Sequence, residues 1–255
     1  MLVRVLGASG SELPGHNPPA FLIDDFLLLD AGTVSLSLDY NAQCKITHIL
    51  LTHAHFDHIK AIPSLLDNMV LIDPDCHLTI LSGREVIEDL KANIFNDRIW
   101  PDFTSLPNSR HPVVQYEEVL PGKPVLVRGY NVSAAKVDHS VPAYGYVIQN
   151  SARSSLVYTG DTGPTEELWN LVSRQRIKAL IIEVSFPDEM LDLAITSGHL
   201  TPSLLTAELG KIPVLPERIY ISHIKPLYHS AIRAQIAELN RPCIEVLEDG
   251  MLLSI

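Results

Sequence analysis

Cysteine is scarce in this sequence. Only 3 cysteines occur among 255 residues, at positions 44, 76 and 243. The number is odd, and no two of them form a Cys-x-x-Cys pair, which excludes both a disulfide framework and a cage of thiolate metal ligands. We therefore expect a protein of a reducing compartment.

Basic residues and long apolar runs are also scarce. The chain has 19 Lys and Arg against 30 Asp and Glu, a net charge of −11, so strong nucleic-acid binding is not expected and an anionic substrate must be captured locally. No apolar run reaches 18 residues, and the first one stops at Gly7, which predicts neither a membrane-spanning helix nor a secretory signal. We expect a soluble cytoplasmic protein without a membrane partner, and we keep a homodimer open as its assembly.

Apolar residues are plentiful, at 46% of the chain, and occur in short segments. This composition allows a sizeable core, and residues 1–255 are expected to form one domain. Strands are expected in two groups with helices after each, which favours two packed sheets covered by helices on the outside. The expected strands cover residues 2–6, 20–23, 26–30, 46–51, 78–81, 113–116, 125–127, 130–136, 145–149, 155–159, 179–183, 218–221 and 244–247, and the expected helices cover 59–66, 85–95, 165–173, 201–209 and 230–239.

The run from Leu51 to His58, Leu-Thr-His-Ala-His-Phe-Asp-His, directly follows a buried strand. On an extended chain His53 and His55 point the same way and can hold one cation between them. Asp57 and His58 lie just beyond, where a turn into a helix can aim them at a second cation. Four clustered polar groups cost free energy when buried unless something pairs with them. The run therefore predicts half of a two-metal site. A single histidine within the strand, in contrast, is explained by an ordinary core or surface position.

Further candidate ligands follow other expected strands. His139, Asp161 and His223 each come directly after a strand, and strand ends of parallel or mixed sheets gather at one edge. Taken singly, they are better interpreted as core, surface or turn residues, but their shared placement favours a common site. Asp30 also closes a strand, where it either orients a ligand histidine or serves only as a turn residue.

Together these motifs resemble the metallo-β-lactamase superfamily. The His-x-His-x-Asp-His run after a strand, Leu-Asp-Ala-Gly upstream, a lone histidine, Thr-Gly-Asp and a final Ser-His carry the resemblance across nearly the whole chain. It implies an αββα four-layer sandwich, two mixed sheets flanked by helices. It also implies two divalent transition-metal ions, and imidazole and carboxylate ligands suit Zn, Mn and Fe alike.

The resemblance also implies a ligand set. The first ion would be held by three histidines, the second by an aspartate and two histidines, and one aspartate would bridge both. The implied ligands are His53, His55 and His139 for the first ion, Asp57, His58 and His223 for the second, and Asp161 as the bridge, with Asp57 also counted among the catalytic residues.

A finer resemblance connects the chain to class II cyclic-nucleotide phosphodiesterases and to the branch that includes the tRNA 3′-processing endonuclease. It rests on the runs Glu-Val-Ser-Phe-Pro, Ser-Gly-His-Leu-Thr-Pro and His-Ile-Lys-Pro. Glu183 and His199 match a carboxylate and a non-ligand histidine that this branch pairs. The family signature usually has Leu where Phe56 stands and Gly or Ser where Ala61 stands.

This resemblance implies hydrolysis of 3′,5′-cyclic nucleotides such as cyclic AMP or cyclic GMP to 5′-monophosphates. Two cations about 3.5–4 Å apart would supply a hydroxide and neutralise a bound phosphodiester. His199, kept protonated by Glu183, would protonate the leaving 3′-oxygen. His199 lies just before the expected start of a helix, which would have Thr201 as its N-cap and Pro202 as its first residue.

Substrate contacts are less specific. Trp100 and Phe103 could stack on a base, or they could belong to the local core. Lys225 could reach a phosphate oxygen, or it could be an exposed lysine.

Three other functions remain open. A lactonase, thioesterase or β-lactamase of the same fold is disfavoured by Glu183 and His199. A tRNA-processing nuclease is disfavoured by the charge of −11 and by the lack of a long basic Gly/Pro-rich insertion. A non-catalytic metal-binding protein is disfavoured by the complete ligand set.

Overall fold

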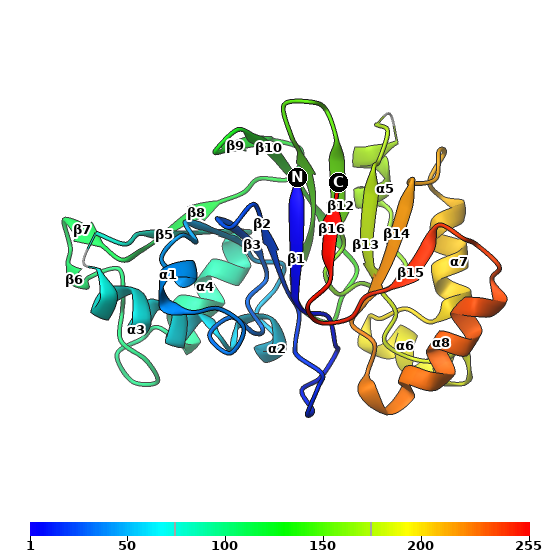
Figure 1. Ribbon diagram of the computed structural model, residues 1–255, viewed down its shortest axis with the longest axis horizontal. Coiled ribbons are helices and arrows are strands. Elements are labelled where there is room, and N and C mark those ends of the chain that lie inside the picture. The colour runs from blue at the N-terminus through cyan, green and yellow to red at the C-terminus, as the bar shows by residue number, and fades with distance from the viewer. Residues whose placement is uncertain (74, 174) are drawn as a thin grey trace.

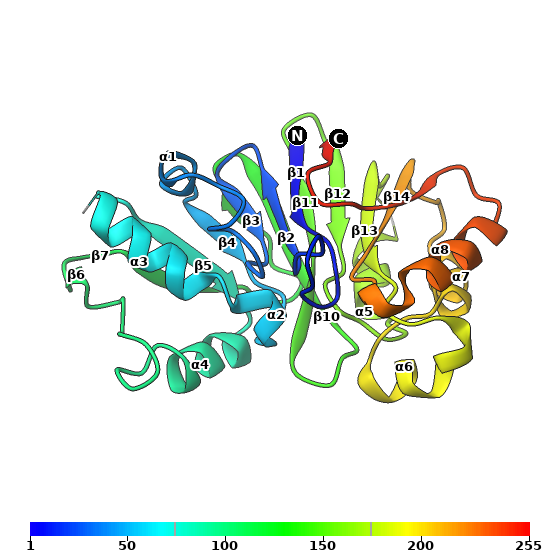
Figure 2. The ribbon, with the colours of Figure 1, turned by 60° about the horizontal axis from the view of Figure 1, so that its bottom comes forward.

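The computed structural model describes residues 1–73, 75–173 and 175–255. Two mixed seven-stranded sheets pack against each other in the middle of the molecule, and helices cover their outer faces (Figures 1 and 2). This four-layer αββα arrangement confirms the predicted fold class.

The first sheet has the strand order β16-β1-β2-β3-β4-β5-β8. Its first four strands, β16, β1, β2 and β3, pair antiparallel, and β3, β4, β5 and β8 run parallel to one another. The β2–β3 turn places Asp24 and Asp25 at φ of 45° and 63°, the left-handed geometry that two-residue hairpins favour. The strands are β1 (Leu2–Gly7), β2 (Ala20–Ile23), β3 (Leu27–Leu29), β4 (His48–Leu50), β5 (Leu78–Ser82), β8 (Val114–Glu118) and β16 (Leu252–Ser254).

The second sheet has the order β15-β14-β13-β12-β11-β10-β9. Strands β9 to β12 pair antiparallel, and β12 to β15 are parallel. The strands are β9 (Val125–Val127), β10 (Tyr130–Val137), β11 (Ala143–Gln149), β12 (Ser155–Tyr158), β13 (Ala179–Glu183), β14 (Arg218–Ser222) and β15 (Ile244–Val246), and a separate ribbon joins β6 (Pro107–Asn108) to β7 (His111–Pro112).

The helices follow apolar patterns of helical spacing. In α3, Ile62, Leu65, Leu66 and Met69 are buried at i, i+3, i+4 and i+7, which gives one apolar face. The helices are α1 (Tyr40–Gln43), α2 (Phe56–Ile59), α3 (Ile62–Ile72), α4 (Arg84–Asn93), α5 (Glu167–Val172), α6 (Leu191–Ser197), α7 (Pro202–Gly210) and α8 (His229–Glu238), with 3₁₀ turns η1 (Asp188–Met190) and η2 (Pro226–Tyr228).

The second sheet contributes to two apolar layers because successive side chains of a strand point to opposite faces. In β13, Ala179 and Ile181 face the core shared with the first sheet, whereas Leu180 and Ile182 face α5, α7 and α8. Because both sheets pack against this shared core, loops from the two sheets come together at one edge.

Several elements differ from the sequence prediction. The helix expected over 59–66 is two helices, because Pro63 fits only in a first turn and α3 begins just before it. The short α1, the weakly patterned α6, the β6–β7 ribbon and the three-residue β16 were not predicted. Each of these elements is too short, or its apolar residues are too irregularly spaced, to show the periodicity of a helix or strand.

A helix needs about 20 mostly apolar residues to span a bilayer. In the described part of the chain, no helix is long and apolar enough to span a membrane.

Candidate active site

The predicted ligands from the first sheet lie beyond β4. His53 and His55 follow the strand in extended backbone, and α2 then carries Asp57 and His58 in its first and last turns. This is the strand-to-helix turn that the sequence predicted.

The predicted ligands from the second sheet follow three of its strands. His139 comes after β10, Asp161 after β12 and His223 after β14. The structure thus brings all seven predicted ligands to the edge where the two sheets meet.

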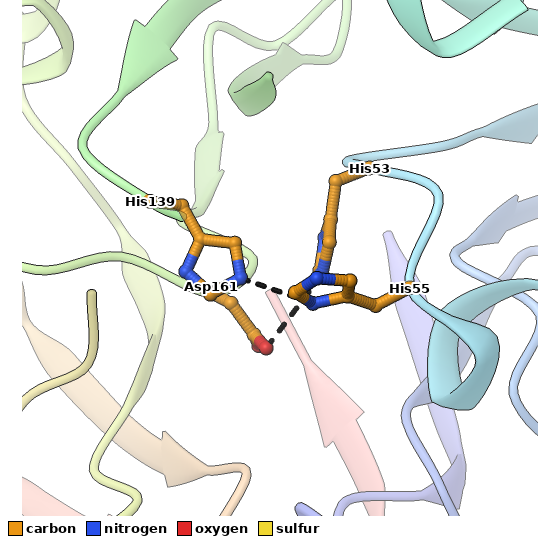
Figure 3. Close-up of side chains that lie close together, drawn as sticks. All are labelled: His53, His55, His139 and Asp161. Atoms are coloured by element: carbon orange, nitrogen blue, oxygen red, sulfur yellow. Dashed lines mark hydrogen bonds and ion pairs between the residues drawn. The ribbon is translucent and has the colours of Figure 1, made fainter. Parts of the chain in front are cut away.

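The first group of ligand atoms belongs to His53, His55, His139 and Asp161. One ligand atom from each lies within 4.8 Å of the others. His139 Nε2 is 3.2 Å from His55 Nδ1, and His53 Nε2 is 3.7 Å from Asp161 Oδ2. Figure 3 shows these side chains pointing toward one another, with His53 and His55 on one loop and His139 and Asp161 on two others.

The second group is Asp57, His58 and His223, whose ligand atoms also lie within 4.8 Å of one another. His223 Nε2 is 3.2 Å from both Asp57 Oδ2 and Asp161 Oδ2, and His58 Nε2 is 3.3 Å from Asp161 Oδ1. Asp161 therefore contacts members of both groups, as a bridging ligand would.

The chemistry of the two groups fits divalent cations. Among the described residues, His53 Nε2, His58 Nε2 and Asp161 Oδ1 are buried without a hydrogen-bond partner. Buried polar atoms without partners cost free energy, and a cation between them would remove that cost. Imidazole and carboxylate ligands of this kind suit a transition metal.

Hydrogen bonds fix the direction of four imidazoles. In each ring Nδ1 is bonded to a neighbouring oxygen, which leaves Nε2 facing the cluster. The partners and distances are Thr52 Oγ1 for His53 at 2.9 Å, Asp30 Oδ2 for His58 at 2.7 Å, Gly198 O for His139 at 2.8 Å and Ser185 Oγ for His223 at 2.8 Å.

Asp30 has the orienting contact that the sequence suggested. It is fully buried, and besides His58 it accepts hydrogen bonds from the Thr52 hydroxyl and from Tyr158 Oη at 2.7 Å. Its φ is 54°, which is also the geometry of a turn. Asp30 thus both contacts a predicted ligand histidine and lies in a turn, and its role in orienting a metal ligand stays a prediction.

The charges around the cluster shift the pKa values of its histidines in opposite directions. Burial and the neighbouring His58 lower the pKa of His53 well below its usual range, so that ring is neutral and able to bind a cation. Burial also lowers the pKa of His58, but the carboxylates of Asp161 and Asp30 outweigh it and raise that pKa well above its usual range. The Asp161 and Asp30 carboxylates thus favour positive charge at the position of His58.

A second pair lies beside the cluster. His199 Nδ1 is 2.6 Å from Glu183 Oε1, and the fully buried Glu183 also accepts hydrogen bonds from Thr162 N and the Ser185 hydroxyl. Burial lowers the pKa of His199, but the Glu183 carboxylate outweighs it, so the pKa is raised. A ligand atom of His199 also lies within 4.8 Å of Asp161 and His223.

Comparison with known proteins agrees with this geometry. The model of the β-lactamase superfamily domain matches residues 27–224, which is more than half of the chain. The chain belongs to the β-lactamase superfamily. It is a hydrolase of the metallo-β-lactamase fold, and its His and Asp groups are compatible with divalent metal binding.

Individual proteins that resemble this chain are phosphodiesterases and ribonucleases. The chain is 28% identical to a 3′,5′-cyclic-nucleotide phosphodiesterase of Aliivibrio fischeri, over 92% of this chain and 86% of that one. It is 24% identical to a ribonuclease Z of Methanosarcina acetivorans, over 99% and 97%. The fold also matches yeast PDE1 with a TM-score of 0.84 at 18% identity, covering 100% of this chain and 99% of the yeast chain.

The predicted substrate contacts of this superfamily member fall in different places. Phe103 is only 1% exposed and packs against Phe95 with ring centroids 6.2 Å apart, so its predicted stacking on a base is wrong. Trp100 is half-buried and lines a cavity beside α2. Lys225 Nζ donates a hydrogen bond to Gly10 O at 2.8 Å, and it lies 5.8 Å from the ring of Phe186.

Sequence reasoning missed the residues that orient the ligands. Thr52 and Tyr158 bond Asp30, and Ser185 connects Glu183 with His223. Ser185 stands inside the Glu-Val-Ser-Phe-Pro run, so its position two residues after Glu183 was the available signal. Tyr158 had no such signal, because its contact joins the two sheets.

Proposed function

We propose that this protein is a dinuclear metal-dependent phosphodiesterase that hydrolyses 3′,5′-cyclic nucleotides to nucleoside 5′-monophosphates. The observation that carries the proposal is the Glu183–His199 pair beside the metal-binding groups. The leaving 3′-oxygen of a ribose needs a proton to depart, and this pair puts a protonatable imidazole beside the metal-binding groups to supply it. The similarity to the Aliivibrio fischeri phosphodiesterase supports the same substrate class.

The proposed ligands are those expected from the sequence. His53, His55 and His139 would hold one divalent cation, Asp57, His58 and His223 the other, and Asp161 would bridge them. When bound, the two cations would supply a hydroxide near neutral pH and neutralise charge on the phosphodiester.

The remaining steps belong to the side chains of the protein. Glu183 accepts a hydrogen bond from the Nδ1–H of His199, so the other N–H of the imidazolium, on Nε2, is free to act as the donor. His199 Nε2 donates this proton to the leaving 3′-oxygen of the ribose. Lys225, held at the Gly10 carbonyl, has two further ammonium protons for a phosphate oxygen.

A ribonuclease Z-like activity is the second candidate, because the relative from Methanosarcina acetivorans carries that name. Long RNA substrates bind largely through phosphate contacts to basic side chains. The net charge of −11 therefore favours a small substrate.

A substrate panel tests the proposal. Protein loaded with Zn, Mn or Fe is incubated with cyclic AMP, cyclic GMP, bis(p-nitrophenyl) phosphate, a tRNA precursor and a lactone. We expect 5′-monophosphate from the cyclic nucleotides and none from chelator-treated protein. Turnover of the lactone alone or of the tRNA precursor alone would overturn the substrate assignment, and no turnover at all would favour a non-catalytic metal-binding protein.

A further inference from the structure

An apolar cavity of about 250 Å³ opens beside α2, between the start of α3 and the loop that follows α4. Its lining is mostly hydrocarbon and aromatic. The lining residues that matter for the argument are Phe56, Ile59, Lys60, Ser64, Ile99 and Trp100. We call this space the Phe56–Trp100 cavity.

The cavity adjoins the short helix α2, which carries two of the proposed metal ligands. Phe56 lies between the ligands His55 and Asp57 in the chain, and α2 begins at this residue. Its side chain is 69% exposed, and Ile99 across the cavity is 66% exposed. Exposed apolar side chains that gather beside a polar cluster are typical of a ligand site, because a ligand would bury them.

The wall that carries Trp100 is held by its own hydrogen bonds. Trp100 N donates to Ile94 O at 3.0 Å, and Asp97 N donates to Trp100 O at 3.0 Å. The buried ring of Phe103 anchors the end of this loop in the core. The indole is therefore positioned before any ligand arrives, which lowers the entropic cost of binding.

The charge and polarity of the cavity indicate a neutral, planar occupant. The Lys60 ammonium is paired with the Glu12 carboxylate, so its charge is balanced. Trp100 Nε1 is buried and, among the described residues, has no hydrogen-bond partner, and the Ser64 hydroxyl borders the same space. An aromatic heterocycle offers faces for Phe56 and Trp100 and ring nitrogens for the indole N–H.

The size of the cavity sets how much of a substrate it can hold. Pockets for drug-sized ligands occupy roughly 300–1,000 Å³. At about 250 Å³ this cavity holds one ring system, not a whole nucleotide. The phosphate of the same molecule would then remain at the metal-binding groups.

We propose that the Phe56–Trp100 cavity binds the nucleobase of the substrate, with Phe56 and Trp100 as the residues that contact the base. This inference rests on the proposed function and deepens it. The described lining contains no carboxylate or carboxamide side chain that could read the exocyclic groups of a base. Adenine and guanine nucleotides should therefore bind with similar affinity, within about tenfold, and a phosphorylated ribose without a base should bind less tightly.

Tryptophan fluorescence tests base binding without any turnover. The chain has 2 tryptophans, and the second, Trp169, is buried with its Nε1 donating to Glu208 at 2.7 Å. Metal-loaded protein is titrated with 5′-AMP, 5′-GMP and ribose 5-phosphate. We expect both nucleotides, but not ribose 5-phosphate, to change the emission of Trp100, and W100F, which keeps Trp169, to lose that change.

Substitutions then measure the contribution of the cavity. F56A and W100A should each weaken 5′-AMP binding by roughly 5- to 150-fold, the effect expected for one lost base–aromatic contact, and should leave ribose 5-phosphate unchanged. L71A is the matched control, because Leu71 is 82% exposed and lies at the far end of α3. Metal content is measured in every variant so that a disturbed metal site is recognised.

The outcomes separate this inference from the proposed function. Equal affinity for 5′-AMP and ribose 5-phosphate, or a loss in F56A that is the same for both, would overturn base binding in the cavity. Hydrolysis of cyclic nucleotides with F56A and W100A unaffected would also overturn it and leave the function standing. Nucleotide binding that depends on both residues, without hydrolysis, would support the cavity and overturn the function.

Discussion

Asp161 contacts histidines of both ligand groups. Its two oxygens lie 3.2 to 3.7 Å from His53, His58 and His223, which belong to both ligand groups. Each histidine belongs to one ion in the proposed scheme. The loss of Asp161 should therefore affect both ions.

We expect D161N to lose both metal ions, and H53A to lose chiefly one. The amide keeps the shape of the carboxylate but removes the charge that attracts the cations. Elemental analysis of protein purified without chelator measures ions per chain, with D192N on the exposed part of α6 as control. Retention of both ions in D161N would refute a bridging role.

His199 is predicted to act as a proton donor, not as a metal ligand. H199A should keep both ions and lose rate by about 10²- to 10⁴-fold with cyclic AMP, whose ribose oxygen needs a proton to leave. With a p-nitrophenyl leaving group, which scarcely needs protonation, the loss should be much smaller. Equal losses on both substrates, or a missing ion, would assign His199 to phosphate or metal binding.

The Glu183–His199 contact also predicts a pH dependence. The carboxylate raises the pKa of His199, so its proton is retained above the ordinary value of about 6.5 and is lost as the pH rises through the raised pKa. In E183Q this effect is removed, and the alkaline fall of kcat should move to lower pH. A kcat profile measured on cyclic AMP from pH 5 to 10 tests this, and an unchanged alkaline limb would contradict it.

At the scale of elements, local rules predicted most of the site. Side-chain alternation after β4 and the gathering of parallel strand ends are properties of short segments, so His53, His139 and Asp161 could be placed from the sequence. Phe103 could not be placed, because a loop aromatic turns inward or outward according to its tertiary contacts. The same holds for β16, whose partner strand lies at the other end of the chain.

The end of α6 supports the first ligand group. Gly198 has φ of 69°, its carbonyl accepts the hydrogen bond from His139, and a Cβ there would lie 2.8 Å from His139 Cα. G198A should displace His139, weaken binding of the first ion by about 10- to 100-fold and lower stability by more than the roughly 1–2 kcal/mol of left-handed strain.

Gly122 provides the matched control for that variant. Its φ is 73°, but nothing lies within 4 Å of an added Cβ. G122A should therefore lose only the strain contribution in thermal unfolding and keep its metal affinity. Equal metal affinities in G198A and G122A would show that the contact with His139 is unimportant.

At the scale of the whole molecule, the proposed ions connect the two sheets. Three of the seven ligands come from loops of the second sheet and four from the run that follows β4. A cation that binds only when both sets are assembled stabilises the folded state.

Removal of the metal should therefore lower Tm. With free metal at about 100 times Kd, one site contributes roughly 2.7 kcal/mol, which corresponds to about 5–10 °C for a chain of this size. Differential scanning calorimetry with and without chelator measures the shift. D161N should show almost no shift, and a wild-type Tm that chelator does not change would contradict the coupling.

The pairing of β16 with β1 affects how the chain assembles during synthesis. Leu2 lies opposite Ser254, so this edge of the first sheet cannot form until β16 has left the ribosome. The hairpins β10–β11 and β11–β12 need only neighbouring residues and can form much earlier. Until β16 has been synthesised, the nascent protein carries β1 as an open edge, which can pair with other copies and promote aggregation.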